Sequence, residues 1–304
     1  MGDDITLLVN PAAGRGGGSR AALRAARVLR AAGFSVRAVT GVDAPDAARR
    51  AREAVADGTG ALVAVGGDGV VSLALGAVAE TSTPLGIVAA GTGNDTARAC
   101  GLPIRAPEAA ATLMAEALAA GASRRVDLGR VGERWFAGVL AAGFDSRVTD
   151  RGNRMRWPRG RLRYDAAVLA ELAALHAVPC RIRLDGGPWS ERDITLVAVG
   201  NGPSYGGGLR ICAGARPDDG HFTVTVVGRV SRTTLVRVYP RVYRGTHLGH
   251  PAVSAFTATR VELDAPGVTG YADGEPLGPL PLTATCVPGA LRLLAPPAGA
   301  GSGG

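Results

Sequence analysis

The sequence predicts an α/β protein that continues into a β-rich part, and three observations carry this prediction. Strand-like and helix-like stretches alternate from Ile5 to about residue 100, as in an open parallel sheet with helices on both faces. After Asp127 the stretches become short, β-rich and separated by turns, which is typical of antiparallel structure. Glycine-rich loops follow three of the early strands. We therefore expect an N-terminal open parallel, Rossmann-like α/β domain over 1–127 and a mostly antiparallel β domain over 128–295.

Each early element has its own signal in the sequence. An apolar run predicts a strand over 5–11, Gly33 ends the helix after it, and an alternating pattern predicts a strand over 34–40. Helical spacing of apolar residues follows over 44–58, and two further strands are expected over 61–67 and 84–91. A helix runs between these strands from about Val70 to about Glu80, and another helix follows the strand over 84–91. Ligands bind such sheets at the carboxyl ends of the strands, where all three glycine-rich loops fall.

The second part contains several short strands and one expected helix from Leu162 to His176. Its final strand is expected either to stay in this domain or to return to the first one. The tail 296–304, with the sequence PPAGAGSGG, has low complexity and predicts disorder.

Composition limits the possible functions. The 304 residues have 46% hydrophobic content, so the chain can bury a sizeable core. Its net charge is +8 and all 34 basic residues are arginine, which excludes a Walker A lysine and suits anionic partners. Aromatic residues make up only 4%, so we expect no nucleic-acid partner. Without a signal peptide or a long apolar run, a cytoplasmic location is expected.

The four cysteines, Cys100, Cys180, Cys212 and Cys286, are widely spaced and contain no C-x-x-C pair. This spacing argues against zinc and gives no disulfide framework, so we interpret them as small buried side chains.

The three glycine-rich loops together predict a phosphate site. They contain the sequences NPAAG after the first strand, GGDG after the third and GTGND after the fourth. Glycine at the start of a helix leaves backbone N–H groups accessible, and these groups bind anions by hydrogen bonds and by the helix dipole. Each loop alone is a weak signal, but three at successive strand ends favour a nucleotide.

These motifs also resemble a known family. LLVNPAAGRG, VAVGGDG, GTGNDTARACGLP, RVDLG, ARPDDGHF and YADGE occur in the order found in bacterial diacylglycerol kinases and sphingosine kinase-like lipid kinases. The resemblance spans the chain from Leu7 to about Leu294. It implies a C-terminal β-sandwich, an active site in the cleft between the domains, and transfer of the γ-phosphoryl group of ATP to a lipid hydroxyl, first of all that of diacylglycerol.

The resemblance also implies which residues bind ATP. They lie in the loop after the first strand, at the end of the second strand, in the GGDG loop and in the GTGND loop: Asn10, Pro11, Ala12, Ala13, Gly14, Thr40, Gly66, Gly67, Asp68, Gly69, Val70, Ser72, Thr92, Gly93 and Asn94. This chain departs from the family at Val70, where threonine is usual, and at Thr96, where phenylalanine is usual.

Acidic residues complete the implied site. Asp68, Asp95 and Asp127 match positions that organise the catalytic Mg²⁺ through water, and Mg²⁺ favours such oxygen ligands. Asp219, with main-chain oxygens near Arg216 and His221, matches a structural metal site, for which a plain turn is the alternative interpretation.

Asp273 is the candidate general base, because a lipid hydroxyl needs a positioned proton acceptor as it attacks phosphorus. Its neighbour Glu275 is expected to orient this base or to share its role. The alternative for Asp273 is an Asp-Gly hairpin turn with exposed acids.

The arginine-rich segment from Arg151 to Tyr164, which includes Trp157, suits an anionic membrane surface and predicts peripheral association. A solvated loop is the alternative. A second copy of the chain, as a homodimer, is a further expected partner. Three other functions stay open: a kinase of sphingoid bases or other lipid alcohols, an NAD kinase relative, and a catalytically silent binder of nucleotide or lipid.

Overall fold

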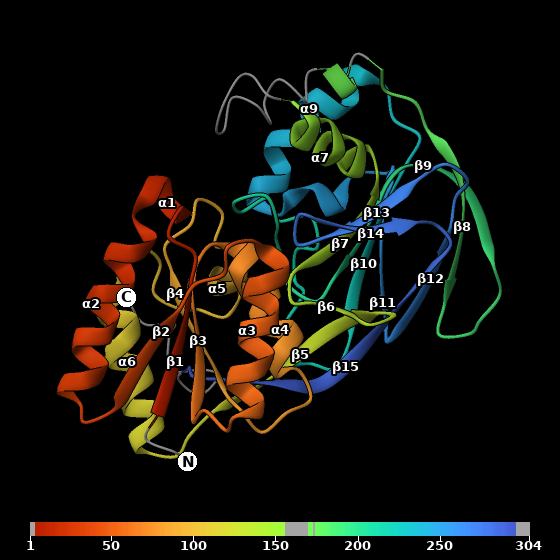
Figure 1. The fold of residues 1–304 in the computed structure, drawn as a ribbon. Helices are drawn as coiled ribbons and strands as arrows, with labels where there is room; N and C mark the ends of the chain where they lie inside the picture. Colours follow the sequence, from red (N-terminus) through yellow and green to blue (C-terminus); the bar gives the residue numbers. More distant parts are fainter. Residues whose placement is uncertain (1–3, 156–169, 173, 296–304) are drawn as a thin grey trace. The chain divides into compact units, whose positions relative to one another are not determined.

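The computed structural model describes residues 4–155, 170–172 and 174–295 (Figure 1). The chain divides into two compact units. Unit 1 contains residues up to Leu128, residues 217–220 and the segment from Val287 on. Unit 2 contains Gly129–Arg216 and His221–Cys286. Strands β5 (Arg124–Val131) and β15 (Leu282–Leu293) each contribute residues to both units.

Unit 1 is built on a parallel sheet, as the alternating pattern predicted. β1 (Asp4–Val9) lies between β2 (Ser35–Val39) and β3 (Ala61–Gly66), and β4 (Leu85–Ala89) pairs with β3. The end of β15 pairs in parallel with β4 through Leu293 and Leu85. All residues of β3 and β4 are buried, which explains their continuous apolar sequence.

Helices cover both faces of this sheet (Figure 1). On one face α2 (Gly18–Ala31) packs against α6 (Pro107–Ala119), and on the other α3 (Ala44–Ala56) packs against α4 (Asp68–Val78). α2 buries mainly alanines at helical spacing, with Leu29 at the end of the stripe. Asp43 caps α3 by accepting a 2.8 Å hydrogen bond from the backbone N–H of Asp46. Two short helices, α1 (Ala13–Gly16) and α5 (Asp95–Ala99), follow strand ends.

Unit 2 is antiparallel. β9 (Ser190–Gly200) pairs along its length with β7 (Val139–Gly143), β8 (Val178–Leu184) and β10 (Phe222–Gly228). Three strand pairs extend this arrangement: β10 with β11 (Val253–Ala258), β8 with β12 (Arg260–Asp264), and β7 with β13 (Thr269–Ala272). β14 (Glu275–Pro279) forms a hairpin with β13, and β6 (Arg134–Phe136) pairs with β5. The rings of Phe136 and Phe222 stack 5.8 Å apart in its core. The fold class predicted from the sequence is thus confirmed in both parts.

Unit 2 also carries helical elements outside its strands. They are α7 (Phe144–Arg154), α9 (Arg232–Arg244) and the 3₁₀ helix η1 (Thr246–Gly249). Most of the helix expected from Leu162 to His176, and the tail 296–304, lie outside the described residues. No helix in the described part of the chain is long and apolar enough to cross a bilayer.

All four cysteines are free and buried, as predicted. Burial raises the pKa of the Cys100 and Cys180 thiols to about 11 and that of Cys212 to about 12. These thiols are therefore protonated and unreactive at neutral pH.

We expect His247 to make the stability of unit 2 depend on pH. It is buried on η1, where its Nε2 lies 3.0 Å from the carbonyl oxygen of Ile211, and desolvation lowers its pKa. As pH falls from about 7 to about 5, the unfolded chain takes up a proton that the folded chain binds less well, so the free energy of unfolding falls. We expect the urea midpoint to fall over this range, and to fall less in His247→Gln. An unchanged pH dependence in the variant would contradict this.

Candidate active site

The loops that follow β1, β3 and β4 lie at one edge of the unit 1 sheet, because the three strands are parallel. Backbone hydrogen bonds join them directly. The N–H of Asn10 donates to the carbonyl oxygen of Val65 at 3.0 Å, and the N–H of Gly91 donates to that of Gly66 at 3.1 Å. The shared edge predicted from the sequence is therefore present.

Most glycines in these loops are required by the protein itself. A Cβ at Gly14, where φ is +58°, would lie 2.3 Å from the carbonyl oxygen of Ala90. A Cβ at Gly91 would lie 2.4 Å from the Cα of Gly67, and one at Gly66 would lie 2.7 Å from the Cγ1 of Val70. These contacts are too short for any side chain, so close packing of loop on loop explains these positions without a ligand.

Gly69 is different. It lies in the first turn of α4, is exposed, and has no described atom within 4 Å of the position that its Cβ would take. Alanine would stabilise a helix at such a position, so neither packing nor backbone conformation requires glycine here. The first N–H groups of α4 have no partner within the helix, and no side chain in the described residues caps it. Open space beside these donors suits a phosphate group.

Asp68 connects the GGDG loop to the GTGND loop. Its Oδ2 accepts a 2.7 Å hydrogen bond from the N–H of Asn94, and its Oδ1 accepts a 3.3 Å bond from the N–H of Thr96. Asn94 is buried in the left-handed conformation, with φ at +58°. Its side chain both accepts from the N–H of Gly91 and donates to the carbonyl oxygen of Gly91, which closes the turn.

Two carboxylates of unit 1 approach Gly93. A Cβ on Gly93 would lie 2.5 Å from Oδ2 of Asp68 and 3.5 Å from Oδ2 of Asp95. Asp95 also accepts a 2.6 Å hydrogen bond from Arg98, whose guanidinium donates to the carbonyl oxygen of Gly93 as well. Carboxylate oxygens are the ligands that suit hydrated Mg²⁺. Asp68 and Asp95 therefore fit a magnesium ion held through water.

Asp127 has a structural use. It is buried on β5, and its two oxygens accept 2.7 Å hydrogen bonds from the N–H groups of Gly220 and Gly289. Its own N–H donates to the carbonyl oxygen of Pro217 at 2.8 Å. Asp127 thus holds residues 217–220 and the end of β15 to unit 1. Its expected role toward Mg²⁺ stays a prediction.

The remaining positions expected to bind ATP are arranged around these loops. Thr40, Pro11, Ala12 and Thr92 are exposed, Ser72 is half-buried, and Ala13 is buried. The two departures from the family, Val70 and Thr96, are both buried. Val70 packs against Gly66, so its side chain faces protein rather than open space.

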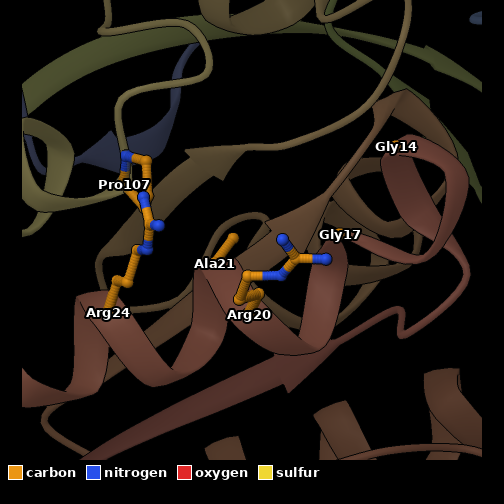
Figure 2. A pocket seen from close by; sticks show the side chains of 6 residues that line it. All are labelled: Gly14, Gly17, Arg20, Ala21, Arg24 and Pro107. Carbon is orange, nitrogen blue, oxygen red and sulfur yellow. The ribbon is translucent and has the colours of Figure 1, made fainter.

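A basic cavity of about 280 Å³ adjoins Gly14 (Figure 2). Its lining includes Arg20 and Arg24 of α2, and Figure 2 shows both side chains extending from the helix along it. Arg24 also lies 3.6 Å from Glu108, whereas no ion pair of Arg20 occurs among the described residues. This arrangement adds positive charge beside the first loop.

In unit 2, Asp273 occupies the turn of the β13–β14 hairpin. Asp273 and Gly274 both have positive φ, at +50° and +87°, as a two-residue turn of this kind requires. The hairpin-turn interpretation of this Asp-Gly pair is therefore correct as to conformation. The side chain, however, contacts other parts of unit 2 and is not simply exposed.

The carboxylate of Asp273 binds three successive backbone N–H groups. Ala137 donates to Oδ2 at 2.9 Å, Gly138 donates to Oδ1 at 3.0 Å, and Val139 donates to Oδ1 at 3.2 Å. Charge-assisted bonds of this type are strong and fix the side chain. Asp273 thereby ties its hairpin to the start of β7.

Sequence reasoning missed two residues that complete this arrangement, Gly138 and Asn201. A Cβ on Gly138 would lie 2.4 Å from Oδ1 of Asp273, so only glycine leaves room for the carboxylate. Asn201 is buried, and its side chain donates a 3.0 Å bond to the carbonyl oxygen of Ala137. The only sequence signals are the glycine of AGVL and the NGP turn.

We expect Gly138→Ala to lower the free energy of unfolding by about 1–3 kcal/mol, because the new methyl group displaces the Asp273 carboxylate. Urea denaturation measures this effect. Gly228→Ala is the matched control in unit 2, since its Cβ would meet nothing closer than 3.6 Å. Equal stability of the two variants would contradict the prediction.

Glu275, at the start of β14, is exposed, and no described group forms a hydrogen bond or ion pair with its carboxylate. The carboxylate of Glu275 thus has no partner among the described residues, whereas that of Asp273 accepts three backbone hydrogen bonds.

The expected structural metal site falls on a segment that connects strands. Arg216, Asp219 and His221 are exposed residues of this segment. Among the described residues no group of three or more His, Cys, Asp or Glu side chains is placed to hold a metal ion. The expected ligands include main-chain oxygens, so this site stays a prediction.

Comparison with known proteins gives matches to both parts of the chain. The family model for the diacylglycerol kinase catalytic domain matches residues 4–131, and the model for the YegS C-terminal NAD kinase beta sandwich-like domain matches residues 138–295. A diacylglycerol kinase of Mycobacterium tuberculosis (strain H37Rv) is 46% identical over 297 residues, which cover 96% of this chain and 95% of that protein. A Pseudomonas fluorescens protein named "Probable lipid kinase YegS-like" is 33% identical and covers 90% of this chain and 89% of its own length.

Two solved structures share the fold. A diacylglycerol kinase from Bacillus anthracis superposes with a TM-score of 0.74 at 23% identity, covering 97% of this chain and 98% of that one. An NAD kinase from Archaeoglobus fulgidus in complex with ATP superposes with a TM-score of 0.52 at 11% identity, covering 96% and 92%.

Proposed function

The chain belongs to the family of bacterial diacylglycerol kinases and related lipid kinases, and from this membership we propose that it phosphorylates diacylglycerol with ATP and Mg²⁺. The observation that supports the nucleotide position is the first turn of α4, where no side chain caps the N–H groups and the space at the Cβ position of Gly69 is open. The identity to a mycobacterial diacylglycerol kinase supports the choice of lipid.

The N–H groups of the first α4 turn, with the loop Asn10–Gly14, bind and orient the phosphates of ATP. Arginine in the cavity beside Gly14 supplies further positive charge. Asp68 and Asp95 hold Mg²⁺, which when bound neutralises charge on the transferring phosphoryl group. The GTGND turn keeps these two carboxylates in place through Asn94.

Glu275 takes the proton of the lipid hydroxyl. As the hydroxyl oxygen bonds to the γ-phosphorus, the bond from that phosphorus to the β–γ bridging oxygen breaks, giving a phosphorylated lipid and ADP. We assign this proton to Glu275 because its carboxylate is exposed and makes no hydrogen bond with the described residues, whereas three backbone N–H groups fix the carboxylate of Asp273 in position. Asp273 positions the hairpin that carries Glu275.

Radiolabelled ATP tests the proposal when it is incubated with Mg²⁺ and a panel of alcohols in mixed micelles: diacylglycerol, a sphingoid base and other lipid alcohols. A separate reaction contains NAD. We expect label in phosphatidic acid. Label found only in another lipid phosphate or in NADP would show that the acceptor is a different molecule from the one proposed. Tight ATP binding without any turnover would identify a silent homologue.

We also propose that the lipid is taken from an anionic membrane surface. The net charge of +8 supports this. Of the arginine-rich segment 151–164 on which the sequence-based expectation rests, residues 156–164 lie outside the described residues.

A further inference from the structure

Helix α9 carries three parallel stripes of different chemistry. Leu235, Tyr239 and Val242 follow the spacing i, i+4, i+7 and pack inward. The residues that directly follow these three form an exposed stripe: Val236, Pro240 and Tyr243. Val236 is 55% exposed and Tyr243 is 42% exposed. One residue further, Arg237, Arg241 and Arg244 form an exposed basic stripe with the same spacing.

The basic stripe has no acidic counterpart in the described part of the chain. No ion pair involves any of its three arginines among the described residues, and no Asp or Glu occurs in the sequence between Gly220 and Glu262. An exposed apolar stripe beside uncompensated arginines is the pattern of a helix that lies in the headgroup region of a membrane.

The helix is well formed on the surface of unit 2. The hydroxyl oxygen of Ser231 caps its start by accepting a 3.1 Å hydrogen bond from the N–H of Thr234, and Gly245 ends it with φ at +70°. Leu235 packs against Phe144 and Val148 of α7, and Figure 1 shows the two helices side by side.

α7 in turn is joined to β13, the strand that leads into the turn of the β13–β14 hairpin. The hydroxyl of Tyr271 on β13 donates a 3.0 Å hydrogen bond to Asp150 of α7. Tyr271 lies two residues before Asp273. Within unit 2, packing and hydrogen bonding therefore connect α9 through α7 to the hairpin that carries Glu275.

We propose that α9 docks unit 2 on an anionic lipid bilayer, with Val236 and Tyr243 inserted among the headgroups and the arginine stripe against lipid phosphates. This inference rests on the proposed lipid kinase function and names the element that contacts the membrane. A second copy of the chain fits this face poorly, because a two-fold contact through α9 would bring two arginine stripes together.

The first experiment measures binding to vesicles by sedimentation, without ATP or diacylglycerol. It uses vesicles of phosphatidylcholine alone and of phosphatidylcholine mixed with phosphatidylglycerol. Arg237→Gln/Arg241→Gln should weaken partitioning onto the mixed vesicles about thirtyfold, because each arginine near the surface contributes about 1 kcal/mol. Arg27→Gln/Arg52→Gln removes the same charge from exposed positions of α2 and α3 and should bind like the parent.

The second experiment reports on insertion directly. Val236→Cys accepts an environment-sensitive thiol dye selectively, because the four native cysteines are buried. The dye emission should shift to shorter wavelength on mixed vesicles. Val42→Cys, from a valine that is 89% exposed on unit 1, is the matched control and should show no shift.

Three results would overturn the proposal: equal partitioning of the two double-arginine variants, no emission shift at position 236, or loss of a dimer instead of vesicle binding in Val236→Ser/Tyr243→Ser. Kinase activity is measured separately on a short-chain, water-soluble diacylglycerol, on which the α9 variants should match the parent. If docking occurs as described but no lipid is phosphorylated, the proposed function fails while the docking surface stands.

Discussion

Replacing Glu275 by glutamine should lower kcat by about 10² to 10⁴, because the attacking hydroxyl loses its proton acceptor. The exposed carboxylate makes no hydrogen bond or ion pair with the described residues, so neither the thermal midpoint nor the affinity for ATP should change. Initial rates with saturating ATP, together with ATP titration and thermal unfolding, measure these effects.

Asp273→Asn is the informative partner of this variant. The amide removes the charge that binds the N–H groups of residues 137–139, so the free energy of unfolding should fall by about 1.5–3 kcal/mol. Activity should fall as well, through loss of the hairpin position. If Asp273→Asn is inactive at full stability while Glu275→Gln keeps its activity, then Asp273 is the base and our assignment is wrong.

Gly69→Ala should raise the KM for ATP about tenfold to a hundredfold, because a methyl group would occupy the space beside the first N–H groups of α4. The same change should stabilise the fold by about 0.5–1 kcal/mol, since alanine is the better helix residue. Initial rates at varied ATP concentration measure the higher KM, and urea denaturation measures the higher stability.

Gly76→Ala is the control for this prediction. Gly76 is also exposed in α4, with no described atom within 4 Å of its Cβ position. This variant should gain the same stability with an unchanged KM. An unchanged KM in Gly69→Ala would exclude the first turn of α4 as the phosphate site.

The predictions from sequence were reliable where a local pattern carries the information. Alternating strands and helices in the first part gave the parallel sheet, and the apolar run of β3 gave a strand buried on both faces. The order of strands and loops then placed Asn10, Gly66 and Gly91 at one edge.

The sequence could not distinguish glycines needed by the protein from glycines needed by a ligand. In GGDG, Gly66 and Gly67 make room for Val70 and Gly91, whereas the space at Gly69 is open. All three look alike in the sequence, because only the folded backbone shows which Cβ positions would meet other atoms.

The same limit applies to the acidic residues. Asp127 and Asp273 match catalytic positions of the family, but each carboxylate binds backbone N–H groups: Asp127 those of Gly220 and Gly289, Asp273 those of residues 137–139. Those donors lie about 90 to 160 positions away along the chain. By itself, the sequence determined the fold class, the loop order and the supply of oxygen ligands and N–H donors, since these follow from local periodicity and residue type. Only the tertiary structure decided which carboxylates are bound by the protein's own backbone, because hydrogen bonds between distant segments form when the chain folds.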